Sequence, residues 1–313
     1  MADTNRTEID MSTRAWGELV LLSAIWGGSF FSIAIALREI GPLTVVLHRV
    51  GWAAVLLWLL VAARGLMGRG PRVPREARVW GAFLVMGCLN NVIPFTLMSW
   101  GQLQIGTGMT SIFNAMTAVF AVLVAAMFLR DEPLSARRLG GILLGFLGVV
   151  VIKGIDRLGA LDPQALGTYA VLAGALSYAF AGVWARRTLR GQPPEVAAAG
   201  MLTGSTVVMV PLVLATEGVP TLALSAPTWG AIGYFAVLAT AGAYLLYYRV
   251  LAMAGAGNLL LCTLIIPPIA ILLGVAFLGE TLAPQTLAGF ALIAAGLAVI
   301  DGRLLRWKRL TNA

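Results

Sequence analysis

Residues 106–134 read GTGMTSIFNAMTAVFAVLVAAMFLRDEPL, and residues 255–282 read GAGNLLLCTLIIPPIAILLGVAFLGETL. Each stretch begins with a Gly-x-Gly tripeptide, continues as a long uncharged apolar run, and reaches Phe-Leu shortly before a glutamate. An α-helix needs about 20 apolar residues to cross a bilayer, and both runs are long enough. The pair therefore predicts two membrane-spanning helices in a chain that repeats itself.

Apolar stretches of similar length fill most of the remaining sequence. Of the 313 residues, 59% are hydrophobic and only 12% are charged, whereas ordinary globular domains carry about 25% charged residues. The stretches do not alternate polar and apolar residues, so they predict helices rather than barrel strands. The first is too long for a cleaved signal peptide, and further spans follow it. We expect an all-α membrane protein with ten transmembrane helices, near residues 17–37, 44–63, 79–99, 106–129, 137–153, 166–186, 195–215, 228–248, 257–279 and 284–302.

The basic residues are distributed unevenly around these spans. If the N-terminus is cytoplasmic, the outside loops hold only Arg38, Lys153 and Arg157 of the 22 Lys and Arg residues, and Arg49 lies within the second span. All the others then fall in cytoplasmic loops and tails, as the positive-inside rule requires. We therefore attribute the net charge of +8 to membrane topology rather than to nucleic-acid binding. The prediction is an inner-membrane protein with both termini in the cytoplasm and no nucleic-acid partner.

The internal similarity extends beyond the two quoted stretches, since Gly141 and Gly148 match Gly289 and Gly296. Each repeat holds five spans, an odd number, so the second repeat must enter the membrane from the opposite side. Two inverted five-helix repeats are the usual construction for alternating access in transporters. The predicted boundaries are a cytoplasmic tail 1–16, a first repeat 17–154, an external connector 155–165, a second repeat 166–303 and a cytoplasmic tail 304–313.

Short motifs along the spans resemble those of a known family. They are Trp26-Gly27-Gly28-Ser29-Phe30, Arg49, Leu176-Ser177-Tyr178-Ala179 and Phe277-Leu278-Gly279-Glu280. In this order they resemble the EamA family of the drug/metabolite transporter superfamily, and within it the YddG-type exporters of aromatic and other amino acids. Ala118 stands where the family often has proline, and Tyr178 where a tryptophan is common. The resemblance implies ten helices, a cavity among helices 1, 3, 4, 6, 8 and 9, and export of small metabolites.

Ionisable groups are scarce inside the predicted spans. No Asp or Glu lies deep within a span, whereas proton relays and cation sites in membranes usually contain one. The chain has one histidine and two cysteines, Cys88 and Cys262, which both lie in apolar stretches. Few side chains are therefore available to bind a metal or to form a nucleophilic triad. The sequence therefore disfavours an enzyme and a cation antiporter, and it predicts no metal and no cofactor.

The predicted spans contain neutral polar and aromatic side chains instead. Asn90, Asn91, Asn114 and Tyr178 lie deep enough either to line a cavity for an amphipathic solute or to form hydrogen bonds between helices. Tryptophan and tyrosine near span ends are expected in interface belts. With residues from the implied cavity helices added, the candidates for substrate binding are Trp26, Ser29, Asn90, Asn91, Asn114, Tyr178, Tyr244, Thr263 and Pro267.

Pro267 and Pro268 stand in the middle of the ninth predicted span. Neither can donate to the carbonyl four residues earlier, which frees the carbonyls of Thr263 and Leu264 at membrane depth. Freed carbonyls are tolerated where they line a polar cavity or find another partner. The pair predicts either a helix break beside the substrate path or a plain kink satisfied by a hydroxyl group or water.

His48 and Arg49 lie near the outer end of the second predicted span. We expect Arg49 mainly to extend toward the outer interface, with contact to a substrate carboxylate as the alternative. His48 is the only side chain that titrates near neutral pH, so it is the candidate for proton coupling. Passive facilitation down a cytoplasmic excess of substrate is the other mode of transport that the sequence allows.

Regularly spaced glycines mark the fifth and tenth spans. Gly141, Gly145 and Gly148, with Gly289 and Gly296, predict close packing of these two helices, although the fifth could equally mediate dimerisation. The chain as a whole is expected to export small metabolites, with aromatic or bulky apolar amino acids as the first choice of substrate. Its other partners are membrane lipids, and it is a monomer or a homodimer. The alternatives are a multidrug or other metabolite exporter of the same fold, and a non-transporting lipid-binding subunit.

Overall fold

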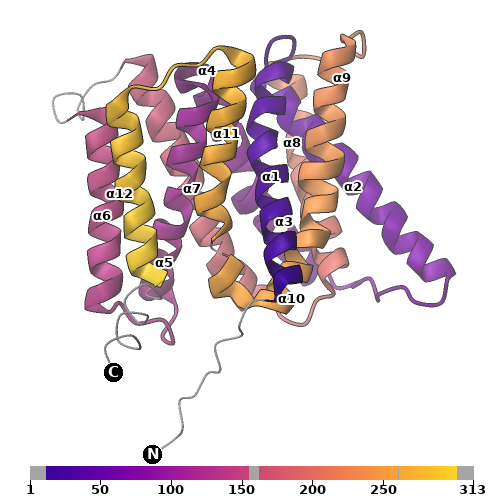
Figure 1. Cartoon of the computed structure of the whole chain (residues 1–313). Helices are drawn as coiled ribbons and strands as arrows, with labels where there is room; N and C mark the ends of the chain where they lie inside the picture. The colour runs from indigo at the N-terminus through magenta and orange to yellow at the C-terminus, as the bar shows by residue number, and fades with distance from the viewer. Residues whose placement is uncertain (1–11, 155–161, 260, 302–313) are drawn as a thin grey trace, which may run out of the picture.

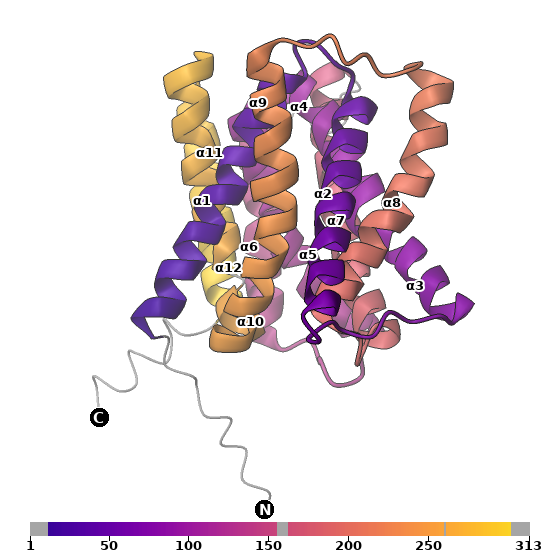
Figure 2. The same ribbon diagram turned by 90° about the vertical axis from the view of Figure 1, so that its right-hand side faces the viewer.

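The secondary structure is entirely helical in the part of the chain that the computed structural model describes, residues 12–154, 162–259 and 261–301. The helices stand side by side as an upright bundle (Figures 1 and 2). Two short segments, η1 and η3, are π-helices. In chain order the elements are α1 Thr13–Ala36, α2 Pro42–Leu66, α3 Ala77–Gly87, η1 Cys88–Val92, α4 Ile93–Asn114, α5 Met116–Phe128, α6 Ala136–Lys153, α7 Pro163–Thr188, α8 Pro194–Thr216, α9 Ala226–Gly233, η3 Tyr234–Gly242, α10 Ala243–Leu259, α11 Cys262–Leu278 and α12 Pro284–Asp301.

The lengths and composition of these helices are those of a membrane protein. Seven of the described helical segments are long and apolar enough to cross a bilayer, and two of the seven, Ala77–Asn114 and Ala226–Gly255, run through a π-helix. Met116–Phe128 and Cys262–Leu278 are apolar but shorter. Within the bundle α2 packs against α8, α4 against α7, and α1 against α11.

The two ends of the bundle differ in what they carry. Figure 1 places the start of α1 and the end of α12 at the same lower end, which we call the terminal end. The opposite end, the far end, holds the connections from α1 to α2, from α8 to α9 and from α11 to α12 (Figures 1 and 2). At the far end Glu217 accepts hydrogen bonds from the backbone N–H groups of Leu43 at 3.0 Å and Thr44 at 2.9 Å. This carboxylate caps the first turn of α2, where amides have no partner inside the helix.

The helices α6 and α12 pack along their glycines, as the glycine spacing predicts. A Cβ atom built on Gly148 would lie 2.6 Å from the carbonyl oxygen of Gly289, and one built on Gly296 would lie 2.6 Å from that of Gly141. Only glycine allows two helix backbones to approach so closely. The two helices stand next to each other at one side of the bundle (Figure 1). The glycine face of α6 therefore packs against α12 of the same chain.

Two glycines interrupt helices at corresponding places in the two halves of the chain. Gly106 has φ 77° and ψ 176°, and Gly255 has φ 75° and ψ 166°. Side chains rarely allow this backbone conformation, which explains why glycine stands at both positions. They are the first glycines of the two Gly-x-Gly tripeptides.

The segments that follow these glycines are divided, whereas the sequence predicts continuous spans. One division lies at Ala115, between α4 and α5, and the other lies immediately before Cys262, where α11 begins. Of the two alternatives at Pro267 and Pro268, a helix break and a plain kink, the break is not found, because α11 continues through both prolines. A proline removes one hydrogen bond and bends a helix, and the rest of the ladder can hold the helix together.

Candidate functional site

Asn90 and Asn91 bring hydrogen-bonding groups into the middle of the bundle. They lie in η1, where a π-helical turn carries an extra residue and rotates the following side chains out of the α-helical register. Asn91 is fully buried, and its Nδ2 donates to Oγ of Ser205 at 2.9 Å. The Tyr244 hydroxyl donates to Oδ1 of Asn91 at 2.9 Å, and Nδ2 of Asn90 donates to the same hydroxyl at 3.1 Å. These bonds link η1 to α8 and α10.

The second π-helix, η3, contributes Thr240. Its hydroxyl donates to the carbonyl oxygen of Phe235 at 2.7 Å and accepts a hydrogen bond from Nε of Arg49 at 2.9 Å. The same offset that matches Gly106 with Gly255 matches Asn91 with Thr240. π-helical turns within α-helices are frequent at functional sites. Each half of the chain thus supplies one π-helix and at least one polar side chain to the centre.

Arg49 extends into the bundle, which corrects the expectation that it extends to the outer interface. The residue is only 8% exposed, and its guanidinium carbon lies 3.9 Å from the centroid of the Phe95 ring. Nη2 lies 3.5 Å from the carbonyl oxygen of Ala239. Thr240 and Ala239 belong to the middle of the Ala226–Gly255 segment. A hydrogen bond and a cation–π contact therefore replace the interfacial water toward which an arginine would otherwise extend.

Aromatic rings surround these polar groups. The ring centroids of Phe95 and Tyr178 are 6.4 Å apart in an edge-on arrangement. The Tyr244 hydroxyl is hydrogen-bonded to both asparagines, and Tyr178 and Tyr244 are only partly buried. We call this set the central cluster, and it consists of Arg49, Asn90, Asn91, Phe95, Tyr178, Ser205, Thr240 and Tyr244.

The predicted binding residues divide between the central cluster and other places. Four belong to the cluster: Asn90, Asn91, Tyr178 and Tyr244. Trp26 borders the central cluster, because its Nε1 donates to the carbonyl oxygen of Ala239 at 3.2 Å. Ser29 is buried, and its hydroxyl donates within α1 to the carbonyl oxygen of Trp26 at 2.7 Å. Asn114 ends α4, where its Oδ1 accepts from the Thr117 hydroxyl at 3.5 Å. Thr263 and Pro267 lie in α11, and Thr263 lines a separate cavity of about 20 Å³.

His48 is a residue of α2, and its side chain faces α9. It is 8% exposed, and its Nδ1 accepts a hydrogen bond from Nε1 of Trp52 at 3.2 Å. Its ring meets that of Trp229 edge-on, with centroids 5.9 Å apart. Nε2 is buried and has no hydrogen-bond partner in the described part of the chain. The candidate for proton coupling is therefore an enclosed side chain.

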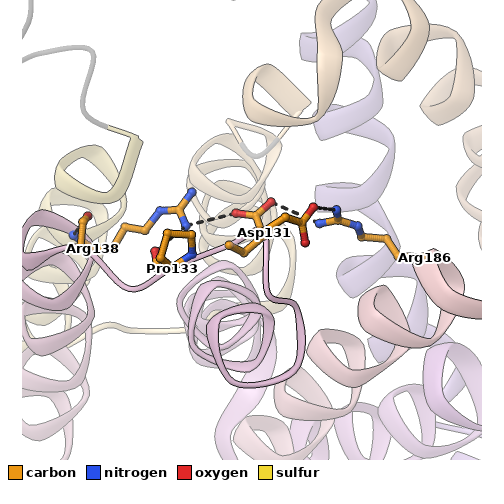
Figure 3. A network of polar contacts seen from close by, with 6 residues as sticks. Asp131, Pro133, Arg138 and Arg186 are labelled. Atoms are coloured by element: carbon orange, nitrogen blue, oxygen red, sulfur yellow. Dashed lines mark hydrogen bonds and ion pairs between the residues drawn. The ribbon is translucent and has the colours of Figure 1, made fainter. Parts of the chain in front are cut away.

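A cleft of about 430 Å³ at the terminal end is lined by charged side chains, and Figure 3 shows the polar contacts among them. Nη2 of Arg186 is 2.6 Å from Oδ2 of Asp131, and Nη1 of Arg186 is 3.2 Å from Oε1 of Glu132. Arg138 binds the other oxygen of Glu132 at 3.1 Å. Hydrogen bonds from its own backbone and from Arg186 lower the pKa of the Asp131 carboxyl below its ordinary value. Ion pairs between these two carboxylates and the two arginines thus account for much of the charged lining of the cleft.

Comparison with known proteins identifies the family. The sequence profile described as the EamA-like transporter family matches residues 15–154 and again residues 165–301. The chain belongs to the EamA-like transporter family. It is therefore a membrane transporter and not an enzyme.

Several curated relatives span nearly the whole chain. A "Probable terminal-alkyne amino-acid exporter" of Streptantibioticus cattleyicolor is 28% identical over 96% of this chain and 97% of its own length. A "Probable amino-acid metabolite efflux pump" of Salmonella typhimurium is 25% identical over 90% and 92%. The "Uncharacterized inner membrane transporter YedA" of Escherichia coli is 27% identical over 85% and 84%. A solved crystal structure, 19% identical, superimposes with a TM-score of 0.65 over 95% of this chain and 99% of its own, which supports the fold alone.

The sequence reasoning missed Phe95, Ser205 and Thr240 as members of the central cluster. Ser205 and Phe95 lie in apolar helices without any pattern that separates them from packing residues. Thr240 did carry a signal, since it matches Asn91 at the offset of the internal repeat. A search for polar residues at repeat-related positions would have found it.

Proposed function

We propose that the protein is an inner-membrane exporter of small metabolites, whose substrates are amino acids with aromatic or bulky apolar side chains. In this proposal the chain crosses the membrane ten times as two inverted repeats, residues 17–154 and 166–303, with both termini in the cytoplasm. Rocking of one repeat against the other exposes the central cluster to each side in turn.

The observation that carries this proposal is the matched pair of interruptions at Gly106 and Gly255. The two glycines have nearly the same φ and ψ, and each follows a segment that contains a π-helix and precedes a divided helix. The family profile also matches once in each half of the chain. Backbone features that recur at one offset support a duplicated unit, and with the five crossings that we propose for each unit the second unit is inverted.

Amino acids are the favoured cargo for two reasons. Two of the relatives are named as an amino-acid exporter and an amino-acid metabolite efflux pump. The central cluster combines a guanidinium group, two amides and aromatic rings, which suits a zwitterion that carries an apolar side chain. A positively charged Arg49 would repel a cationic drug, so it argues against the multidrug alternative.

Counterflow in proteoliposomes that contain only this protein tests the proposal. The vesicles are loaded with unlabelled amino acid, and the entry of labelled Phe, Leu, Met and Thr is followed with and without a pH gradient. We expect the vesicles to accumulate Phe, Leu and Met, and protein-free liposomes to accumulate none of them. Counterflow that survives collapse of the gradient supports a facilitator, whereas flux that needs the gradient supports proton coupling through His48. Absence of flux with every amino acid overturns the substrate assignment.

A further inference from the structure

Arg49 is a buried cation without an acidic partner in the described part of the chain. The ion pairs found there join other arginines to Glu18, Asp131, Glu132 and Glu195, and none of them includes Arg49. Only 8% of the residue is exposed, at a depth where charged side chains are rare. An ionisable group inside a membrane bundle is by default a candidate functional group. A partner that arrives from outside the chain would supply the negative charge that this buried arginine lacks.

The contacts of Arg49 hold its guanidinium plane in one orientation. Nε donates to Thr240 at 2.9 Å, and the flat face rests on Phe95 at 3.9 Å. The edge formed by Nη1 and Nη2 is less engaged, since Nη2 has one long contact of 3.5 Å to Ala239, and Nη1 donates to no described residue. This edge is the part of a guanidinium that pairs with both oxygens of a carboxylate.

We propose that the guanidinium of Arg49 binds the carboxylate of the transported molecule, which is an α-amino acid or another monocarboxylate with an apolar side chain. The proposal rests on the proposed function and narrows its substrate class. Phe95 and Thr240 position the arginine, and the Tyr178 ring, which meets the Phe95 ring edge-on, offers an aromatic surface for the apolar part of the ligand. A bound carboxylate supplies the counter-charge that the described residues lack.

Competition on the wild-type carrier tests this without any substitution. Uptake of labelled Phe is measured against excess 3-phenylpropionate, which has the carboxylate but no ammonium group, and against phenylalaninamide, which has the ammonium group but no carboxylate. We expect 3-phenylpropionate to compete about tenfold better than phenylalaninamide. Equal competition, or the reverse order, overturns the carboxylate assignment.

The variant Arg49→Lys tests the residue itself. Lysine keeps the positive charge but lacks the planar guanidinium group and its paired N–H donors, so we expect the KM for Phe to rise about tenfold. Arg249→Lys is the matched control, because Arg249 is exposed and pairs with Glu18 at the terminal end. Thermal stabilisation of the detergent-solubilised protein by 3-phenylpropionate gives a readout that does not depend on transport.

The two readouts separate the inference from the proposed function. Stabilisation that is present in the wild type and in Arg249→Lys but lost in Arg49→Lys supports the site, even if no amino acid is transported, in which case only the proposed function fails. Unchanged KM and unchanged stabilisation in Arg49→Lys overturn the inference. Absence of stabilisation and of competition by 3-phenylpropionate in the wild type overturns it as well.

A second inference rests on a different observation, the carboxylate of Glu280 at the far end. Its two oxygens accept hydrogen bonds from the backbone N–H groups of Thr107 at 2.6 Å and Gly108 at 2.9 Å. These amides begin the helical stretch after Gly106, where they have no partner inside the helix and the helix dipole favours an anion. Glu280 thereby ties the connection between α11 and α12 to α4.

Glu132 is the residue of the first repeat that corresponds to Glu280. In this conformation Arg138 and Arg186 bind its carboxylate at the terminal end (Figure 3). We infer that Glu280 holds the far end closed, and that Glu132 exchanges its arginines for the amides that follow Gly255 when the terminal end closes. This inference rests on the alternation of the two repeats in the proposed function.

Thiol labelling in detergent tests the tie at Glu280 independently of transport. A Ser111→Cys variant, in a background with Cys88→Ser and Cys262→Ser, places a thiol at a fully buried position one turn beyond the tied amides. We expect Glu280→Gln to speed its reaction with a maleimide about tenfold. The control is Glu217→Gln, which removes a carboxylate cap at the same end without touching α4. Equal labelling rates in the two variants overturn the inference.

A second variant removes a donor rather than the acceptor. Thr107→Pro deletes one of the two tied N–H groups at the start of a helical stretch, where proline is tolerated. We expect labelling of the Ser111→Cys thiol to be faster in this variant too, and a rate equal to that of the parent contradicts the tie.

Discussion

Asn90 and Asn91 are neighbours in one π-helical turn, but their side chains have different surroundings. Asn91 is fully buried, and both its amide nitrogen and its amide oxygen are hydrogen-bonded. Asn90 is partly exposed, and although its Nδ2 donates to Tyr244, its Oδ1 accepts no hydrogen bond from a described residue. We infer that Asn91 holds helices together, whereas Asn90 offers an acceptor to the ammonium group of a bound amino acid.

We therefore expect Asn91→Ala to lower stability and Asn90→Ala to weaken substrate binding. Asn91→Ala removes the acceptor of the Tyr244 hydroxyl and the donor to the buried Ser205 hydroxyl, and we expect a cost of about 1–3 kcal/mol. Melting temperature in detergent and the KM of counterflow measure the two effects. A larger fall in melting temperature for Asn90→Ala than for Asn91→Ala contradicts this division.

The depth of a residue along a span could be predicted from the sequence, but the direction in which its side chain extends could not. The position of Arg49 near the start of the second span is read correctly from the sequence. Whether it turns to the outer interface or to Thr240 depends on the rotation of α2, which its neighbours determine through packing. The same limit explains why the sequence treats Asn90 and Asn91 alike.

Among the helices, the contact between α6 and α12 offers a matched pair of substitutions. A Cβ atom at Gly148 would lie 2.6 Å from the carbonyl oxygen of Gly289, whereas one at Gly140 meets nothing within 4 Å. We expect Gly148→Ala to lower the free energy of unfolding by about 1–3 kcal/mol through overpacking. Gly140→Ala should leave it unchanged or raise it slightly, because alanine favours the helix. Equal melting temperatures of the two variants in detergent contradict the close packing.

Glu39 connects the end of α1 with the start of α9 and predicts a dependence on pH. Its Oε2 accepts from the backbone N–H of Ser225 at 3.0 Å, and hydrogen bonds with Ser225 lower the pKa of the Glu39 carboxyl below 4.5. Because the pKa is lowered in the folded state, the stabilisation is complete above the unfolded pKa and is lost as the pH falls through the folded pKa.

We expect Glu39→Gln to melt below the wild type at pH 7, and the difference to shrink as the pH falls below about 4.5. The control is Glu76→Gln, at an exposed residue before α3 whose side chain forms no cap. A difference between wild type and Glu39→Gln that grows in acid contradicts the assignment.

Most helices could be predicted from the sequence, but their irregularities could not. Apolar length predicts a span directly, and glycine spacing predicts the contact between α6 and α12 because small residues mark close approach. An extra residue in a π-helical turn changes neither composition nor hydropathy, so η1 and η3 left no pattern. Pro267 and Pro268 predicted either a break or a plain kink, and the division lies before Cys262 instead.

Across the whole molecule, two repeats with similar sequences make different contacts. Glu280 is bound by backbone amides at the far end, while Glu132 is bound by arginines at the terminal end. A transporter that alternates must be compatible with two arrangements of one sequence. For this reason the sequence predicts a repeat, but it does not predict which of these two glutamates is bound by backbone amides in this conformation.

Orientation in the membrane decides which compartment the far end, which we infer to be closed, faces. The distribution of basic residues predicts that the terminal end is cytoplasmic. We expect alkaline phosphatase, which folds only outside the cytoplasm, to be active when inserted at Gly218 between α8 and α9 and inactive when fused after residue 313. Green fluorescent protein at the same two positions should give the reverse pattern. The opposite result would place Glu280 on the cytoplasmic side, and its tie to Thr107 and Gly108 would then hold back cytoplasmic substrate instead of closing the carrier to the outside.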